Sequence, residues 1–131
     1  MGALAHLPPA QGISAMQTIN VVVLNRWFLG VFVGTAALSG ACAVLAVASE
    51  LPRAGWIVAG ALAYIAGTFA VTAARNVPLN NRLANVSPSD QKGHDMWTHY
   101  LRRWTHWNHI RTAGAAIATL SFALGALGGP A

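Results

Sequence analysis

Residues 27–49 read WFLGVFVGTAALSGACAVLAVAS, and this stretch contains no charged side chain. Two further stretches share this property: residues 54–74, AGWIVAGALAYIAGTFAVTAA, and residues 112–130, which follow Arg111. Each contains about 20 residues, the length that an α-helix needs to cross a hydrocarbon core about 30 Å thick. None shows the polar and apolar alternation of a transmembrane β-strand. The sequence therefore predicts an all-α membrane helix bundle with three transmembrane helices.

The composition of the 131 residues supports this prediction, because 55% are hydrophobic and only 8% are charged. A water-soluble domain carries about 25% charged residues, so the composition excludes a soluble globular enzyme. The net charge of +5 results from the scarcity of acidic residues, and no Lys/Arg-rich arm is present. We therefore expect one membrane domain over residues 1–131, with lipids as partners and no nucleic acid.

The few basic residues predict an orientation in the cell membrane. If all three stretches span the membrane, residues 1–26 and 75–111 share one face, and Arg53 is the basic residue of the other face. The shared face holds Arg26, Arg75, Arg82, Lys92, Arg102, Arg103 and Arg111. Cytoplasmic loops carry the excess of Lys and Arg, so we expect a multi-pass protein with loop 75–111 in the cytoplasm and the C-terminus outside.

The segment before the first span is neither a signal peptide nor a full span, because it lacks a basic start and Pro8, Pro9 and Gly12 interrupt it. The prolines can begin a short helix from about residue 10 to residue 23, which we expect to lie near the membrane interface.

The segment after the second span has its own helix signals. Pro78 is expected to end the second helix, and Ser87, Pro88 and Asp90 form a capping pattern for the next one. That helix is predicted to be long, with Gly93 as a weak point, and to extend from the cytoplasm into the third span.

Two polar faces predict a pocket near the cytoplasmic side. At 100° per residue, one face of the long helix carries Trp97, Tyr100, Trp104, Asn108 and Arg111. The second span and its extension carry Tyr64, Thr68, Thr72, Asn76 and Asn80 at a spacing of four. Polar groups within a membrane are costly unless they are paired, so these two faces should meet inside the bundle.

Simpler interpretations of the same residues remain open. The aromatic residues could form an interfacial belt, Arg111 could extend to lipid headgroups, and the histidines could form a solvated surface. Gly30 and Gly34 form a GxxxG pair, which favours close helix packing and could also support a homo-oligomer.

A metal site is not expected. Cys42 is the single cysteine, which excludes a site made of several thiolates. His99, His106 and His109 could share a helix face, but the Glu-x-x-His repeats of di-iron bundles are missing.

The chain resembles a known family. The runs Arg75-Asn76-Val77-Pro78-Leu79-Asn80-Asn81 and Trp107-Asn108-His109-Ile110-Arg111-Thr112, with Trp97, Tyr100 and Trp104, are similar to the small integral-membrane family that contains the anthrone oxygenases of polyketide pathways. The segments Leu7-Pro8-Pro9-Ala10-Gln11-Gly12 and Met16-Gln17-Thr18-Ile19-Asn20 extend the resemblance over essentially the whole chain. Family members usually have a further spanning helix before the Leu-Pro-Pro segment, and Met1 falls about where that helix would end. The resemblance therefore leaves two alternatives for the usual first helix, which this sequence lacks: a misassigned start site, or a fourth helix that comes from elsewhere.

The resemblance implies a cofactor-independent oxygenase, which uses dioxygen as co-substrate to oxidise a flat polycyclic phenolic ketone. Trp97, Tyr100 and Trp104 would then supply the stacking surface for this apolar aromatic or quinone-like molecule. The catalytic groups would be Arg111 and Asn108, which hold the oxyanion with the help of Asn76 or Asn80, and His109 as the base. The helical projection places His109 well away from the aromatic face.

Two classes of function remain on the sequence alone. One is a membrane-embedded oxygenase, and the other is a non-catalytic membrane subunit that binds a lipid or a partner. Polar side chains that converge on a cavity would favour the enzyme. A filled and mutually hydrogen-bonded core would favour the subunit.

Overall fold

The computed structural model describes residues 1–127. Its helices are α1 (Gly2–Ala5), α2 (Pro9–Val23), α3 (Arg26–Ala48), α4 (Ala54–Leu62), η1 (Ala63–Ala70), η2 (Thr72–Asn76), α5 (Val77–Ala84) and α6 (Gln91–Ala126), where η denotes π-helical turns. These residues contain no β-strand, so the predicted all-α class is confirmed over the part of the chain that the structure covers.

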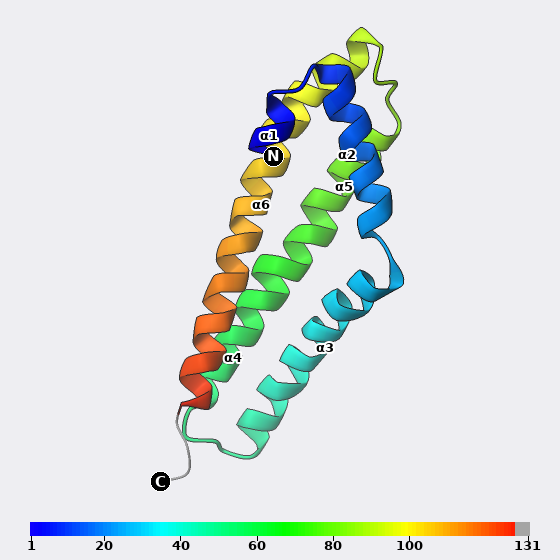
Figure 1. The fold of residues 1–131 in the computed structure, drawn as a ribbon. Helices are drawn as coiled ribbons and strands as arrows, with labels where there is room; N and C mark the ends of the chain where they lie inside the picture. Colours follow the sequence, from blue (N-terminus) through cyan, green and yellow to red (C-terminus); the bar gives the residue numbers. More distant parts are fainter. Residues whose placement is uncertain (128–131) are drawn as a thin grey trace.

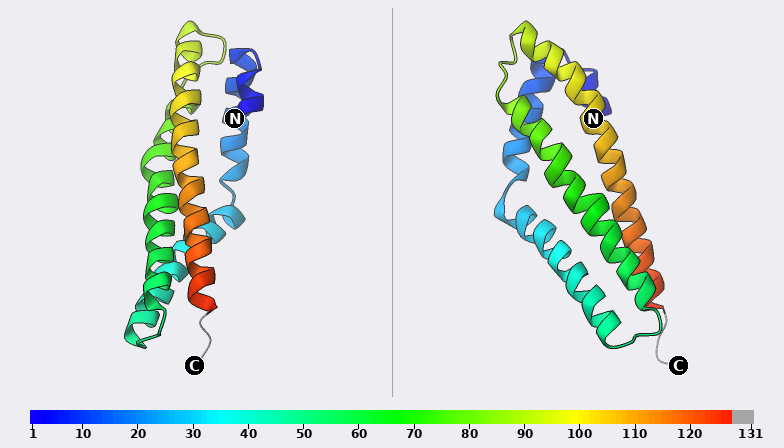
Figure 2. Two further views of the ribbon diagram at one scale, coloured as in Figure 1. Left: turned by 90° about the vertical axis from the view of Figure 1, so that its left-hand side faces the viewer. Right: turned by 180° about the vertical axis from the view of Figure 1, so that it is seen from behind.

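Two long rods form the body of the molecule (Figure 1). α4, η1, η2 and α5 follow one another as one rod, and α6 runs antiparallel beside it. α3 packs against α4 and η1, while α2 packs against α5 and α6 near the loop that joins them (Figure 2). At the opposite end, Arg53 donates a hydrogen bond to the carbonyl of Leu124 (3.1 Å).

Two helices are long and apolar enough to cross a membrane, namely Arg26–Ala48 and Ala54–Ala84. The third predicted span, residues 112–130, begins within α6, and its last three residues lie outside the part that the structure describes. The short N-terminal helix is present as α2, and proline stands in its first turn as expected.

The prediction that Pro78 ends the second helix is wrong. The helix continues to Ala84, because wide π-helical turns precede the proline and the Val77 N–H bonds to the Thr72 carbonyl five residues back. Proline interrupts an α-helix because it lacks an N–H and its ring meets the carbonyl four residues earlier. A wide turn immediately before Pro78 changes the hydrogen-bond pattern at that point and lets the helix continue.

The predicted start of the last long helix is also wrong. α6 begins at Gln91 with Asp90 as its N-cap, and the Asp90 side chain makes no capping hydrogen bond. The chain at Ser87 folds back on α6, so that a Cβ on Gly93 would lie 2.2 Å from the Ser87 carbonyl oxygen. Gly93 is buried and permits this close approach, and α6 continues through it.

Apolar side chains are distributed in two different ways. Near the α5–α6 loop they form a buried core, which consists of Ile13, Met16, Leu79, Leu83, Trp97 and Tyr100. Along α3 and the C-terminal half of α6, large apolar residues lie at the surface, for example Val31 at 71% and Leu120 at 66% exposure. An apolar surface of this extent is typical of helices that contact lipid.

Small residues act as predicted where helices cross. A Cβ on Gly60 would lie 3.1 Å from the Phe122 ring, and one on Gly67 would lie 3.0 Å from the Gly114 Cα. Gly30 and Gly34 are different, because a Cβ there would meet nothing within 4 Å. The homo-oligomer contact through these two residues therefore stays a prediction.

Candidate functional site

A cavity of about 250 Å³ lies where α2 and α3 meet the long rod and α6. It is lined by Met16, Ile19, Asn20, Val23, Leu24, Phe28, Thr72, Asn76, Val77, Asn80, Trp104 and Arg111. Five of these residues come from the two polar faces predicted from sequence: Thr72, Asn76, Asn80, Trp104 and Arg111. The two faces therefore meet, and their meeting point is a cavity.

Asn76 is the most enclosed polar group of the cavity. Its side chain is 2% exposed, and neither atom of its amide has a hydrogen-bond partner within residues 1–127. The ring nitrogen of Trp104 is also buried without a partner in this part of the chain. Each such group costs about 1–3 kcal/mol when it is left unsatisfied, and binding sites are where such groups are retained.

Arg111 provides the positive charge of the cavity. Its guanidinium donates a hydrogen bond to the Asn108 side-chain oxygen and lies 6.0 Å from the centre of the Trp104 ring. Burial lowers the pKa of Arg111 from its usual value, but an arginine remains a cation in proteins. Asn108 thus fixes the position of the charge without lining this cavity itself.

The predicted aromatic surface is divided between core and cavity. The rings of Trp97 and Tyr100 stack with their centres 5.7 Å apart, and the ring centres of Tyr100 and Trp104 are 6.3 Å apart. Of these three residues, only Trp104 lines the cavity. The Tyr100 hydroxyl donates to the Asn80 side-chain oxygen at 2.8 Å. Burial raises the pKa of Tyr100, and the nearby Asn20 side chain opposes this effect to a smaller extent. Tyr100 is therefore a neutral donor that positions Asn80.

Tyr64 and Thr68, the first two polar residues of the face predicted on the second span, bond to neighbouring helices and do not line the cavity. The Tyr64 hydroxyl donates to the Phe32 carbonyl of α3 at 3.2 Å. The Thr68 hydroxyl donates to the main-chain carbonyl of Arg111 at 3.1 Å, which ties η1 to α6 close to the guanidinium. This face points toward the bundle interior as expected, since Thr68 and Thr72 are no more than 9% exposed.

His109 lies at a different position from Arg111. It is exposed and lines an adjoining cavity of about 460 Å³ together with Met1, Gly2, Leu4, Met16, Ile19, Trp104, Thr105 and Asn108. Met16, Ile19 and Trp104 line both cavities. The other two histidines considered as metal ligands lie apart from His109: His99 is between α5 and α6, and His106 packs edge-on against Trp107.

Sequence reasoning missed the contribution of α2. Met16, Ile19, Asn20, Val23 and Leu24 all line the cavity, and the side-chain nitrogen of Asn20 is buried without a partner within residues 1–127. The signal was present, because Asn20 is an amide in an otherwise apolar helical turn and lies four residues after Met16.

The sequence model of the anthrone oxygenase family matches residues 25–121 of the chain. The chain belongs to the anthrone oxygenase family. The match includes η2, α5 and most of α6, which contribute Asn76, Asn80, Trp104 and Arg111 to the cavity, and it begins after α2. No curated protein and no solved structure is significantly similar to this member of the anthrone oxygenase family.

Proposed function

We propose that the protein is a multi-pass membrane protein with spans at residues 27–49, 54–74 and 112–130, loop 75–111 in the cytoplasm and the C-terminus outside. The exposed apolar surface of α3 and of the C-terminal half of α6 supports three spans, because water would disfavour that surface and lipid would not. The bias of basic residues toward loop 75–111 supports the orientation.

Within this arrangement, we propose that the cavity binds a flat phenolic ketone of the anthrone type and oxidises it with dioxygen. The observation that carries this proposal is the buried amide of Asn76, which has no hydrogen-bond partner within residues 1–127 and lines a largely apolar cavity together with Arg111. An amide and a guanidinium in an otherwise largely apolar cavity match a ring system that has oxygen at one position and carbon elsewhere.

In the proposed reaction, the main task of the protein is to stabilise the oxyanion of the substrate. Removal of a proton from the acidic methylene carbon gives an anion whose charge lies on the ketone oxygen, where Arg111 and Asn76 would hold it. This anion passes an electron to dioxygen, and the two radicals combine at the methylene carbon. Loss of water then leaves a carbonyl, so that one dioxygen is consumed and one water is released for each methylene oxidised.

The walls of the cavity support entry of the substrate from the bilayer. Val23, Leu24 and Phe28 lie where α2 meets α3, and each is more than a third exposed. An apolar molecule dissolved in the membrane could reach Arg111 past these side chains without crossing water.

A non-catalytic subunit is the less favoured alternative. Such a protein needs a filled core whose polar groups bond to one another. The open cavity, and the side-chain atoms of Asn76 and Trp104 that have no partner among the residues the structure describes, do not fit that description.

Asn76→Leu tests the oxygenase proposal. Oxygen uptake by membranes supplied with an anthrone should fall about 100-fold in this variant, the loss typical for one oxyanion donor. The melting temperature should stay the same or rise, because the variant removes a buried amide that has no partner within residues 1–127. Asn81→Leu is the matched control, since Asn81 is exposed and does not line the cavity. Equal uptake by Asn76→Leu and wild type would refute the oxygenase.

We also propose His109 as the base, and His109→Gln tests this role. The proton would pass to it through the adjoining cavity that shares Trp104 with the substrate site. We expect His109→Gln to lower kcat about 100-fold, as for loss of a general base. His106→Gln is the control, because His106 is exposed on the same helix and packs against Trp107. An unchanged kcat in His109→Gln would assign the proton to solvent water instead.

A further inference from the structure

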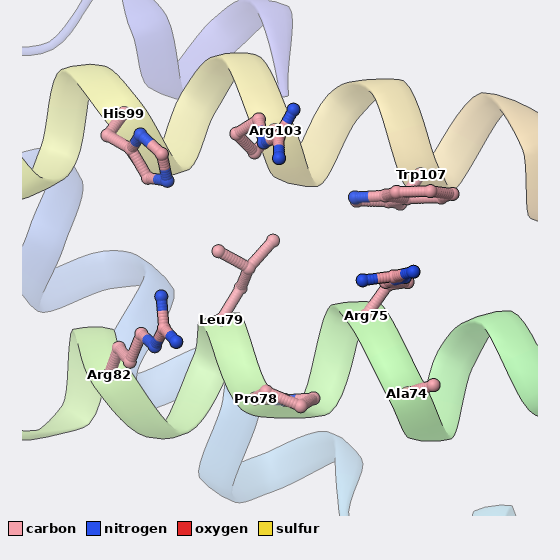
Figure 3. Close-up of a pocket in the computed structure, with 8 residues that line it drawn as sticks. All are labelled: Ala74, Arg75, Pro78, Leu79, Arg82, His99, Arg103 and Trp107. Carbon is pink, nitrogen blue, oxygen red and sulfur yellow. The ribbon is translucent and has the colours of Figure 1, made fainter.

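A second, strongly basic groove lies between α5 and α6, apart from the proposed substrate site (Figure 3). Its volume is about 130 Å³, and its lining residues are Ala74, Arg75, Pro78, Leu79, Arg82, His99, Arg103 and Trp107. None of these residues lines the cavity of Asn76 and Arg111. The groove is therefore a separate site, which the oxygenase proposal does not use.

Three arginines from the two rods line this groove. Arg75 and Arg82 come from the first rod and Arg103 from α6, with His99 beside Arg103 (Figure 3). The chain has only three acidic residues, Glu50, Asp90 and Asp95, and none of them lines the groove. Three positive charges without a carboxylate in the lining create a positive potential that an anion would relieve.

The groove also has features of a shaped site. The Arg75 guanidinium lies over the Trp107 ring at 4.9 Å, which holds it at one end of the groove. Leu79 extends into the space between the helices, between the Arg82 end and the Arg75 end (Figure 3). Guanidinium groups present donors in a planar fork that matches phosphate oxygens, and they are preferred over lysine where phosphate is recognised.

We propose that this groove binds a phosphate group, carried either by the headgroup of an anionic phospholipid or by inorganic phosphate. Its small volume suits one tetrahedral oxyanion and is too small for a polycyclic substrate. The groove begins where the predicted span of residues 54–74 ends, on the face with seven of the eight basic residues. Basic pockets between helices at this level of the cytoplasmic leaflet bind anionic headgroups, which favours the lipid as the source.

The test compares ligands on the purified full chain in detergent micelles. Short-chain phosphatidylglycerol, short-chain phosphatidylcholine and inorganic phosphate are each titrated at constant ionic strength, and the shift in melting temperature gives an apparent Kd. We expect phosphatidylglycerol to stabilise the wild type and phosphatidylcholine to have little effect, because the groove repels the choline cation.

Arg82→Gln/Arg103→Gln should weaken phosphatidylglycerol binding at least about tenfold, as expected when charge-assisted hydrogen bonds to a phosphate are lost. Both side chains are exposed, so the fold should tolerate the change. Arg75→Gln is a second, independent variant and should weaken binding in the same direction. Arg26→Gln/Arg102→Gln removes the same charge outside the groove and should bind like wild type.

Each result decides between the possible sources. Stabilisation by phosphatidylglycerol alone identifies the lipid headgroup, whereas equal stabilisation by inorganic phosphate identifies free phosphate as a sufficient ligand. Equal weakening in the groove variants and in Arg26→Gln/Arg102→Gln would overturn the proposal in favour of non-specific charge attraction. So would unchanged binding in both groove variants. Because the readout is binding, these outcomes are independent of whether the protein oxidises anthrones.

Discussion

Replacing Arg111 by methionine is expected to lower kcat for anthrone-dependent oxygen uptake by about 10²–10³-fold, the largest loss of activity predicted for a single side chain. Arg111 is the cationic side chain among the residues that line the cavity, and Asn108 holds it in place. Without it, the substrate oxyanion would have to form in an apolar cavity with no compensating charge, and such a charge is costly to bury.

Arg111→Met should change the charge in the cavity without changing the contact between η1 and α6. The Arg111 carbonyl, which accepts the Thr68 hydrogen bond, is main chain and is kept in the variant, so the helix contact should survive. Arg111→Lys should restore part of the rate, because it keeps the charge but loses the planar fork. Arg102→Met removes an exposed charge elsewhere on α6 and should leave kcat unchanged. If Arg111→Met oxidised anthrones at the rate of the control, Arg111 would have no catalytic role.

Gly114→Val is expected to cause the largest loss of stability, about 3 kcal/mol or more. A Cβ at this position would lie 2.8 Å from the Gly67 carbonyl carbon and 2.9 Å from its Cα. These are main-chain atoms of η1, which cannot rotate away as a side chain would. The two rods would have to separate where Gly67 and Gly114 meet, and the hydrogen bond from Thr68 to the Arg111 carbonyl would break.

Thermal unfolding in detergent would measure this effect. Gly55→Val is the matched control, because a Cβ at Gly55 meets nothing within 4 Å, and its melting temperature should stay within a few degrees of wild type. Gly114→Ala should lie between the two, since it adds the clash without the second branch. A melting temperature for Gly114→Val equal to that of Gly55→Val would show that the helices are less tightly packed at Gly67.

The parts of the fold that depend on polarity could be predicted from sequence. The spacing of charges located the long apolar helices, and the four-residue spacing of Thr72, Asn76 and Asn80 located one wall of the cavity. The facing wall, Trp104 and Arg111, followed from projection of a regular helix. Five of the ten residues on these two predicted faces line the cavity, because polar side chains at a regular helical spacing identify one face of a helix.

The parts that depend on backbone geometry could not be predicted. Pro78 interrupts a regular α-helix, but the helix widens before it and continues, and no residue type in the sequence announces a π-helical turn. The start of α6 is set by the approach of Ser87 to Gly93, a tertiary contact that overrides a good local capping pattern. Trp97 and Tyr100 share the helix face of Trp104, but α2 covers them, and its position required the structure.

Because residues 63–76 form wide π-helical turns, the number of residues in this segment determines the direction in which its polar side chains point. In a regular α-helix, residues four apart drift by about 40° around the axis, so Thr68, Thr72 and Asn76 would turn progressively away from a common face. π-helical turns hold more residues per turn and counter this drift, and all three side chains are buried. Deletion of a single residue there would rotate one side of the segment against the other by about 100° and shift it along the axis by about 1.5 Å. Insertions and deletions should therefore be tolerated in the loops that flank this rod and selected against within it, even where single substitutions are harmless.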